Sequence, residues 1–132
     1  MKPRRRGFTL MELITVLVVI SILVTIGLNR FWGVKDEGLL STVKSDLRNL
    51  ATAQEDYFAV NYTYASVAAD LDPVGFRPSP GVTINVTHVQ QDGWAGNATH
   101  LSLGARQCGI FTGNAPPGMG APATVNGVIG CN

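Results

Sequence analysis

The fold is decided by residues 6–28, which read RGFTLMELITVLVVISILVTIGL. From Phe8 to Leu28 this stretch holds 21 residues with one charged side chain, Glu12, and no proline. As an α-helix it is roughly 31 Å long at about 1.5 Å per residue, which is enough to cross the hydrocarbon core of a bilayer. The sequence therefore predicts a membrane-spanning helix near the start of the chain.

Basic side chains in front of the apolar run predict its orientation. Lys2, Arg4, Arg5 and Arg6 supply four of the ten Lys and Arg residues, and such clusters are retained on the cytoplasmic side of an inserting helix. A cleaved secretory signal is the simpler alternative, but the run exceeds the usual length of about 7–15 residues and no A-x-A-like cleavage site follows it. Glu12 is the third objection, because an acidic side chain inside a membrane helix is costly and marks a functional site.

The basic leader, Gly7, Phe8 and Glu12, followed by the long apolar run, resemble the amino-terminal signal of type IV prepilins and related pseudopilins. This resemblance implies cleavage after Gly7 by a membrane-embedded prepilin peptidase and N-methylation of Phe8, the new first residue. It also implies that the apolar helix is retained and that the pilus assembly machinery builds a homo-oligomeric helical filament through it.

Glu12 acquires a role through the same resemblance. Cleavage leaves a cationic amine on Phe8, and the Glu12 carboxylate pairs with the amine of a neighbouring subunit during assembly in that family. Two charges that are each costly in lipid become tolerable when they meet, so the pair would set the register between subunits. Pairing of Glu12 with the amine of its own subunit is the competing interpretation.

The rest of the chain predicts an α+β fold of the type IV pilin-like class. Apolar residues at helical spacing from Leu39 predict an amphipathic helix to about Val60. Residues 61–80 read as an irregular connection, and strands are expected at 82–89, 99–103 and 107–111, with 124–129 possible as a closing strand. The expected organisation is a leader at 1–7, a transmembrane and filament-core helix at 8–29, a head helix at 30–60, and a head of three or four antiparallel strands at 61–132.

Two cysteines, Cys108 and Cys131, lie outside the cytoplasm if the orientation is correct, and disulfides persist there. The family resemblance implies that they form a disulfide that closes an exposed carboxy-terminal loop. Two free thiols or a metal-binding pair are the alternatives.

Other chemistry finds little support in the sequence. His88 and His100 match no recognised zinc spacing with the cysteines and are expected to be surface or packing residues. No nucleophile motif or phosphate-binding glycine loop is present, so we expect no catalytic residue, no metal site, no cofactor and no enzymatic activity. After Leu71 the basic residues are only Arg77 and Arg106, so no nucleic-acid partner is expected.

The sequence therefore predicts a structural subunit of a type IV pilus that serves adhesion, motility or a related surface function. The precursor would reside in the inner membrane with its amino terminus in the cytoplasm and its head in the periplasm, and the mature subunit in an extracellular filament. The alternatives are a pseudopilin of a type II secretion system and a minor pilin with a ligand-binding head. The absence of a helix proline fits a pseudopilin, whereas the cysteines favour a pilin, because major pseudopilins generally use a calcium-binding loop instead.

Overall fold

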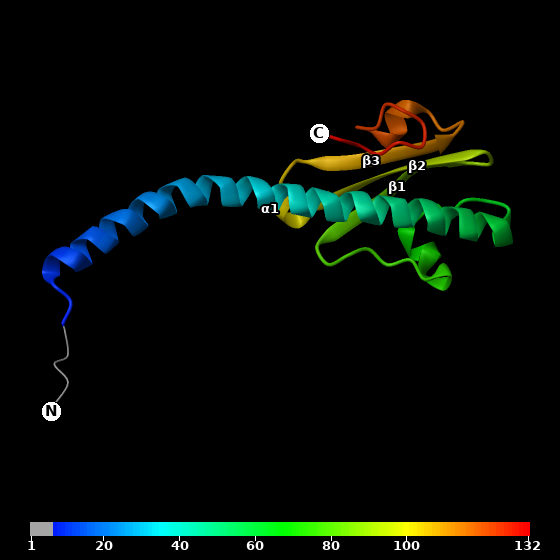
Figure 1. Ribbon diagram of the computed structural model, residues 1–132. Coiled ribbons are helices and arrows are strands. Elements are labelled where there is room, and N and C mark those ends of the chain that lie inside the picture. The colour runs from blue at the N-terminus through cyan, green and yellow to red at the C-terminus, as the bar shows by residue number, and fades with distance from the viewer. Residues whose placement is uncertain (1–6) are drawn as a thin grey trace. The chain divides into compact units, whose positions relative to one another are not determined.

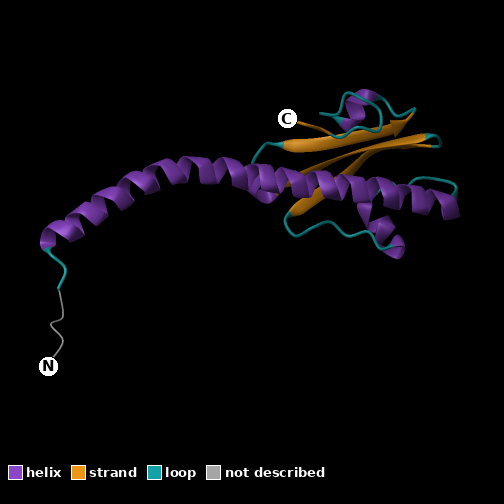
Figure 2. Cartoon of the chain, in the orientation of Figure 1, coloured by secondary structure: helices purple, strands orange, loops and turns teal. Residues whose placement is uncertain are grey.

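A computed structural model describes residues 7–132, apart from the side chains of Asn29 and Trp32. The chain forms two compact units that divide between Lys35 and Asp36. One long helix, α1 (Leu10–Asn61), contributes to both units, and all four strands belong to the second (Figures 1 and 2). The second unit, residues 36–132, is called the head below.

The sheet of the head has four antiparallel strands in the order β1-β2-β3-β4. Their bounds are β1 (Val82–Gln90), β2 (Gly93–His100), β3 (Gln107–Gly113) and β4 (Gly130–Cys131). A two-residue turn at Gln91 and Asp92 joins β1 to β2. Helix α1 and this antiparallel sheet confirm the predicted α+β, type IV pilin-like fold.

The main core lies between α1 and one face of the sheet. Leu40, Val43, Leu47 and Leu50 of α1 are 0–2% exposed, and their spacing of three and four residues puts them on one side of the helix. The sheet contributes alternate residues along its strands, which lie on one face, among them Ile84, Trp94, Ala98, Cys108 and Ile110. The amphipathic helix predicted to end near Val60 is confirmed, because α1 ends at Asn61 and buries the predicted stripe.

The opposite face of the sheet is covered by the tail, residues 114–129. Ala95 and Phe111, which are register partners on β2 and β3, form a second small core with Ala115 and Ala123 of the tail. This close approach needs small residues, since a Cβ on Gly109 would collide with the backbone oxygen of Gly120. Figure 1 shows the tail, in orange and red, beside β3.

Three short 3₁₀ helices complete the head. Helix η1 (Ala68–Val74) lies within the predicted irregular connection and buries Leu71. Helix η2 (Leu101–Leu103) follows β2, and η3 (Pro117–Gly120) lies in the tail.

Two strand predictions are wrong. Residues 101–103 form η2, while β2 begins earlier, at Gly93. The segment 93–98 is rich in Gly and Ala, which have low strand propensity, but tertiary packing overrides that preference. Trp94 is fully buried, and the Leu50 side chain packs close to Gly96. The closing strand is Gly130–Cys131 rather than 124–129, because the register pairs Cys131 with Cys108.

Candidate functional site

The residues that the sequence singled out for processing, Gly7 and Phe8, lie just before α1. Gly7, Phe8 and Thr9 lie outside the helix, which begins at Leu10. The Phe8 side chain is 80% exposed. The peptide bond between Gly7 and Phe8 therefore lies in non-helical backbone beside an exposed aromatic side chain.

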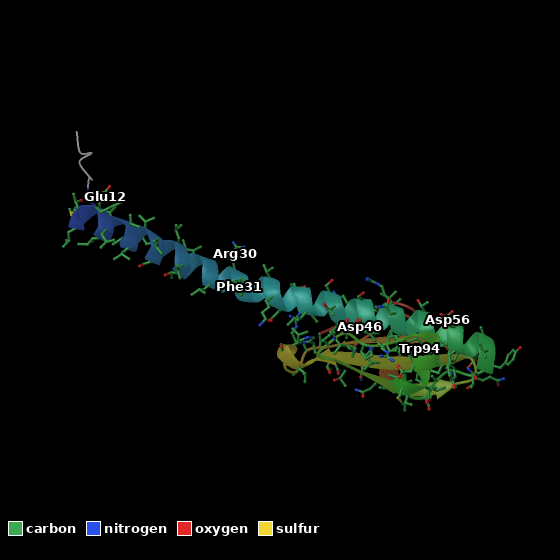
Figure 3. The ribbon with its side chains drawn as sticks, turned by 90° about the horizontal axis from the view of Figure 1, so that it is seen from below. Glu12, Arg30, Phe31, Asp46, Asp56 and Trp94 are labelled. Carbon is green, nitrogen blue, oxygen red and sulfur yellow. A yellow bond between two sulfur atoms is a disulfide. The ribbon has the colours of Figure 1, made fainter. Side chains whose placement is uncertain are left out.

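Glu12 and Thr9 form a reciprocal pair of hydrogen bonds at this helix start. The Glu12 backbone N–H donates to Thr9 Oγ1 at 3.2 Å, and the Thr9 N–H donates to Glu12 Oε2 at 3.5 Å. This is a capping box, in which a Thr and a Glu three residues later satisfy backbone donors that the first helical turn leaves unpaired. In the uncleaved chain, the Glu12 carboxylate thus accepts a hydrogen bond from Thr9, the residue that follows Phe8. Figure 3 shows Glu12 at the beginning of the helix.

The apolar part of α1 is exposed on all sides within the first unit. The large apolar side chains between Leu10 and Leu28 are 47–76% exposed, and α1 is the one helix in residues 7–132 that is long and apolar enough to cross a membrane. A helix that is apolar all round belongs in a membrane or in the core of an assembly.

The hydroxyl groups of this segment fit a lipid environment. Thr15, Ser21 and Thr25 each donate to the backbone oxygen four residues earlier, at 2.7–2.8 Å. Hydroxyls satisfied within the helix need no water. Glu12 is the one ionisable side chain between Leu10 and Leu28.

The two predicted cysteines meet in the head. Cys108 of β3 and Cys131 of β4 form a disulfide, with Cα atoms 4.1 Å apart, and this excludes free thiols and a metal-binding pair. The tail that the bond encloses has an exposed surface that includes Met119, Val125 and Val128.

Two polar residues of α1 are buried, although the polar side chains of an amphipathic helix usually face water. Asp46 is 3% exposed, and its carboxylate accepts the N–H and the hydroxyl proton of Ser79 at 2.8 and 2.9 Å. Gln54 is fully buried and exchanges two hydrogen bonds with the backbone of Ala65. Both side chains hold the connection between α1 and β1 against the helix, a role that helical periodicity alone does not reveal.

Tyr64 lies near the carboxyl-terminal end of α1. Its ring stacks on Phe58, with ring centroids 4.7 Å apart, and its hydroxyl donates to Glu55 Oε1 at 3.3 Å. Burial, followed by the negative charge of Glu55, raises the pKa of Tyr64 above 10.0.

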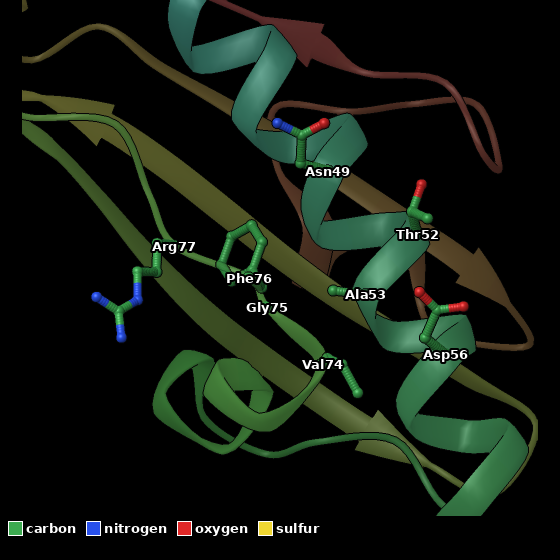
Figure 4. A pocket seen from close by; sticks show the side chains of 8 residues that line it. All are labelled: Asn49, Thr52, Ala53, Asp56, Val74, Gly75, Phe76 and Arg77. Carbon is green, nitrogen blue, oxygen red and sulfur yellow. The ribbon is translucent and has the colours of Figure 1, made fainter.

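A pocket of about 250 Å³ lies between α1 and the segment 74–77, and Figure 4 shows the side chains that line it. Its lining consists of Asn49, Thr52, Ala53, Asp56, Val74, Gly75, Phe76 and Arg77. The polar groups face separate partners: the Thr52 hydroxyl donates to the backbone oxygen of Arg48, and Arg77 lies 3.6 Å from Asp72. Among these lining residues, no hydrogen bond connects a nucleophilic side chain to a basic one.

The two histidines serve local contacts. His100 Nδ1 accepts the N–H of Ser102 at 3.1 Å and caps η2, and a ring nitrogen of His88 lies 3.4 Å from Gln90 Oε1. No group of three or more metal-ligating side chains occurs in the described part of the chain.

The start of the chain matches a known protein family. Residues 2–28 match the family described as the prokaryotic N-terminal methylation motif. The chain is 37% identical over 79 residues to the type IV major pilin protein PilA of Myxococcus xanthus, an alignment that covers 60% of this chain and 34% of that pilin. This chain thus spans about a third of the length of that relative.

Two relatives belong to secretion systems. The chain is 28% identical over 119 residues to the type II secretion system core protein G of Klebsiella michiganensis, which covers 84% of both chains. The corresponding protein of Pseudomonas aeruginosa is 26% identical over 78 residues, covering 59% of this chain and 55% of that protein. The chain thus carries the prokaryotic N-terminal methylation motif at residues 2–28 and is similar to type IV pilins and to type II secretion pseudopilins.

Proposed function

We propose that this chain is a structural subunit of a type IV pilus filament and not an enzyme. One observation carries the proposal: a processing motif leads directly into a helix whose apolar side chains are exposed on every side. A single chain cannot cover that surface in water. Lipid covers it while the subunit is stored in the inner membrane, and neighbouring helices cover it in the extracellular filament.

The precursor inserts with its amino terminus in the cytoplasm and its head outside. Prepilin peptidase then cleaves after Gly7 and Phe8 is methylated. The non-helical backbone at residues 7–9 and the exposed Phe8 side chain support this step, because a peptidase needs access to both sides of the bond that it cuts.

After cleavage the Phe8 amine carries a positive charge and Glu12 is the carboxylate nearest to it in the sequence. Pairing of Glu12 with the amine of a neighbouring subunit compensates both charges in an apolar surrounding and fixes the register of assembly. The capping box competes for the same carboxylate. The interaction between subunits must therefore displace or share the bond to Thr9.

Glu12→Gln tests this assignment. Glutamine keeps the size of the side chain and can still cap the helix, so cleavage after Gly7 should continue while the yield of sheared surface filaments falls. Asp36→Asn removes a carboxylate elsewhere on α1 and is the matched control. A normal filament yield from Glu12→Gln would show that the carboxylate does not pair the subunits.

A type II secretion pseudopilin is the second candidate. It is favoured by the alignment with the Klebsiella protein, which extends over 84% of both chains, whereas the Cys108–Cys131 disulfide favours a pilin. Deletion of the gene separates the two: loss of surface fibres with normal protein secretion supports the pilus, and the reverse supports the secretion system.

A further inference from the structure

The head contains a second groove, of about 440 Å³, between α1 and the tail. Lys44, Arg48 and Ala51 line it from α1, Ile110 forms part of its floor, and Val128 lies on the tail side. The groove is thus apolar within and basic along its helical rim.

The basic rim has no negative partner within residues 7–132. The ion pairs there join Arg77 to Asp72 and Arg106 to Glu37, and neither includes Lys44 or Arg48. These two cations are four residues apart on one side of α1, where like charges repel. An occupant of the groove that carries carboxylates would relieve this repulsion.

The carboxyl-terminal end of α1 has the complementary character. Glu55 and Asp56 are exposed, and Val60 is 74% exposed. The last turn of the helix contains no basic residue, so the partial negative charge of its terminal carbonyl groups is not neutralised. This end therefore combines an apolar side chain with negative charge, as the groove requires.

The end of α1 cannot reach the groove of its own molecule. Arg48 and Glu55, the nearest pair of opposite charges, are seven residues apart, which is about 10 Å along the helix, and no ion pair joins them within the described residues. The complementary surfaces can thus meet only between copies.

We propose that the groove binds the carboxyl-terminal end of α1 of a second copy, with Lys44 and Arg48 paired to the second copy's Glu55 and Asp56. The contact joins different surfaces of identical chains, which produces a ring or an open helical array instead of a closed dimer. The helical array is the form that fits the proposed filament. The inference rests on the proposed filament and adds the contact between its heads.

Site-specific photo-cross-linking tests the contact in cells that produce the full chain. A photoreactive amino acid replaces Val128, and mass spectrometry maps the product in sheared fibres. We expect a dimer of this chain cross-linked to residues 55–62. The same probe at Leu101, which is exposed but outside the groove, should not label that segment. A product that maps elsewhere in the chain or to another protein would overturn the proposal.

Charge exchange provides a second test. Arg48→Glu should lower fibre yield roughly tenfold, because it places like charges opposite each other, and the added change Glu55→Arg should restore it. Arg77→Glu alters charge equally on an exposed side chain outside the groove and should leave the yield unchanged. Equal membrane levels of all variants show that they fold. Wild-type yield from Arg48→Glu refutes the inference alone, whereas wild-type cells whose fibres lack this chain refute the proposed function too.

Discussion

At the scale of single residues, Gln54 and Asp46 determine how the chain returns from α1 to the sheet. The Gln54 amide donates to Ala65 O at 2.9 Å and accepts from Ala65 N at 2.8 Å. Both partners are buried, so water cannot replace the bonds. Asp46 holds Ser79 in the same manner, 33 positions further along.

Gln54→Ala should therefore destabilise the head. The substitution leaves a buried N–H and a buried carbonyl without partners. Each costs about 1–3 kcal/mol, so the free energy of unfolding should fall by about 2–6 kcal/mol. Denaturant unfolding of the full chain in detergent measures it. Asn49→Ala, on the exposed side of α1, should change it by less than about 0.5 kcal/mol; similar losses from both variants would contradict the role of Gln54.

Tyr64 gives a prediction about pH. Its pKa is raised in the folded chain, so its neutral form is favoured; this contribution to stability is complete below the unfolded value of 10.0 and is lost as the pH rises through the folded value. Glu55→Gln removes a nearby negative charge and should lower the pKa of Tyr64. Ultraviolet titration of the phenolate detects the change, and an unaltered titration curve would argue against the Glu55 contact.

At the scale of elements, the packing of α1 on the sheet supplies most of the core. Leu47 is fully buried between them. Leu47→Ala should lower the free energy of unfolding by about 2–5 kcal/mol, since the cavity that it leaves is only partly filled by relaxation. Val60→Ala removes an exposed apolar side chain from the same helix and is the control. Thermal unfolding followed by circular dichroism compares them, and equal midpoints would refute the assigned packing.

The tail depends on its disulfide. It is rich in Gly and Pro and contributes little apolar surface to the core. Replacing Cys108 and Cys131 together by Ser should lower stability by about 3 kcal/mol, from the entropy of the loop that the bond closes. Hydrogen exchange should increase first in residues 114–129; unchanged protection there would show that packing alone holds the tail.

The sequence was sufficient for elements with strong periodicity or specific motifs. The apolar run, the amphipathic stripe from Leu40 to Leu50 and the alternating strand at 82–89 all predicted their elements, and the cysteines met as the family resemblance implied. Strand β2 was placed too late because Gly and Ala carry no strand signal, and its stability comes from Trp94 and its neighbours. The sequence did not predict the basic groove, because its walls come from α1 and from tail residues more than 70 positions away.

At the scale of the whole molecule, the proposed cleavage after Gly7 would change the net charge of the chain. The sequence has a net charge of +1. Removal of residues 1–7 takes away four basic side chains and no acidic one, which leaves six Lys and Arg against nine Asp and Glu, a net charge of −3. The proposed mature subunit thus combines a weakly acidic head with an apolar helix, which the proposed filament covers.

The most direct test of this account is the intact mass of the main subunit in sheared surface fibres. We expect this chain to begin at Phe8, to carry one added methyl group, and to lack the two hydrogens that the Cys108–Cys131 disulfide removes. Fibres without this chain, or a chain that retains residues 1–7 within them, would contradict the proposed function.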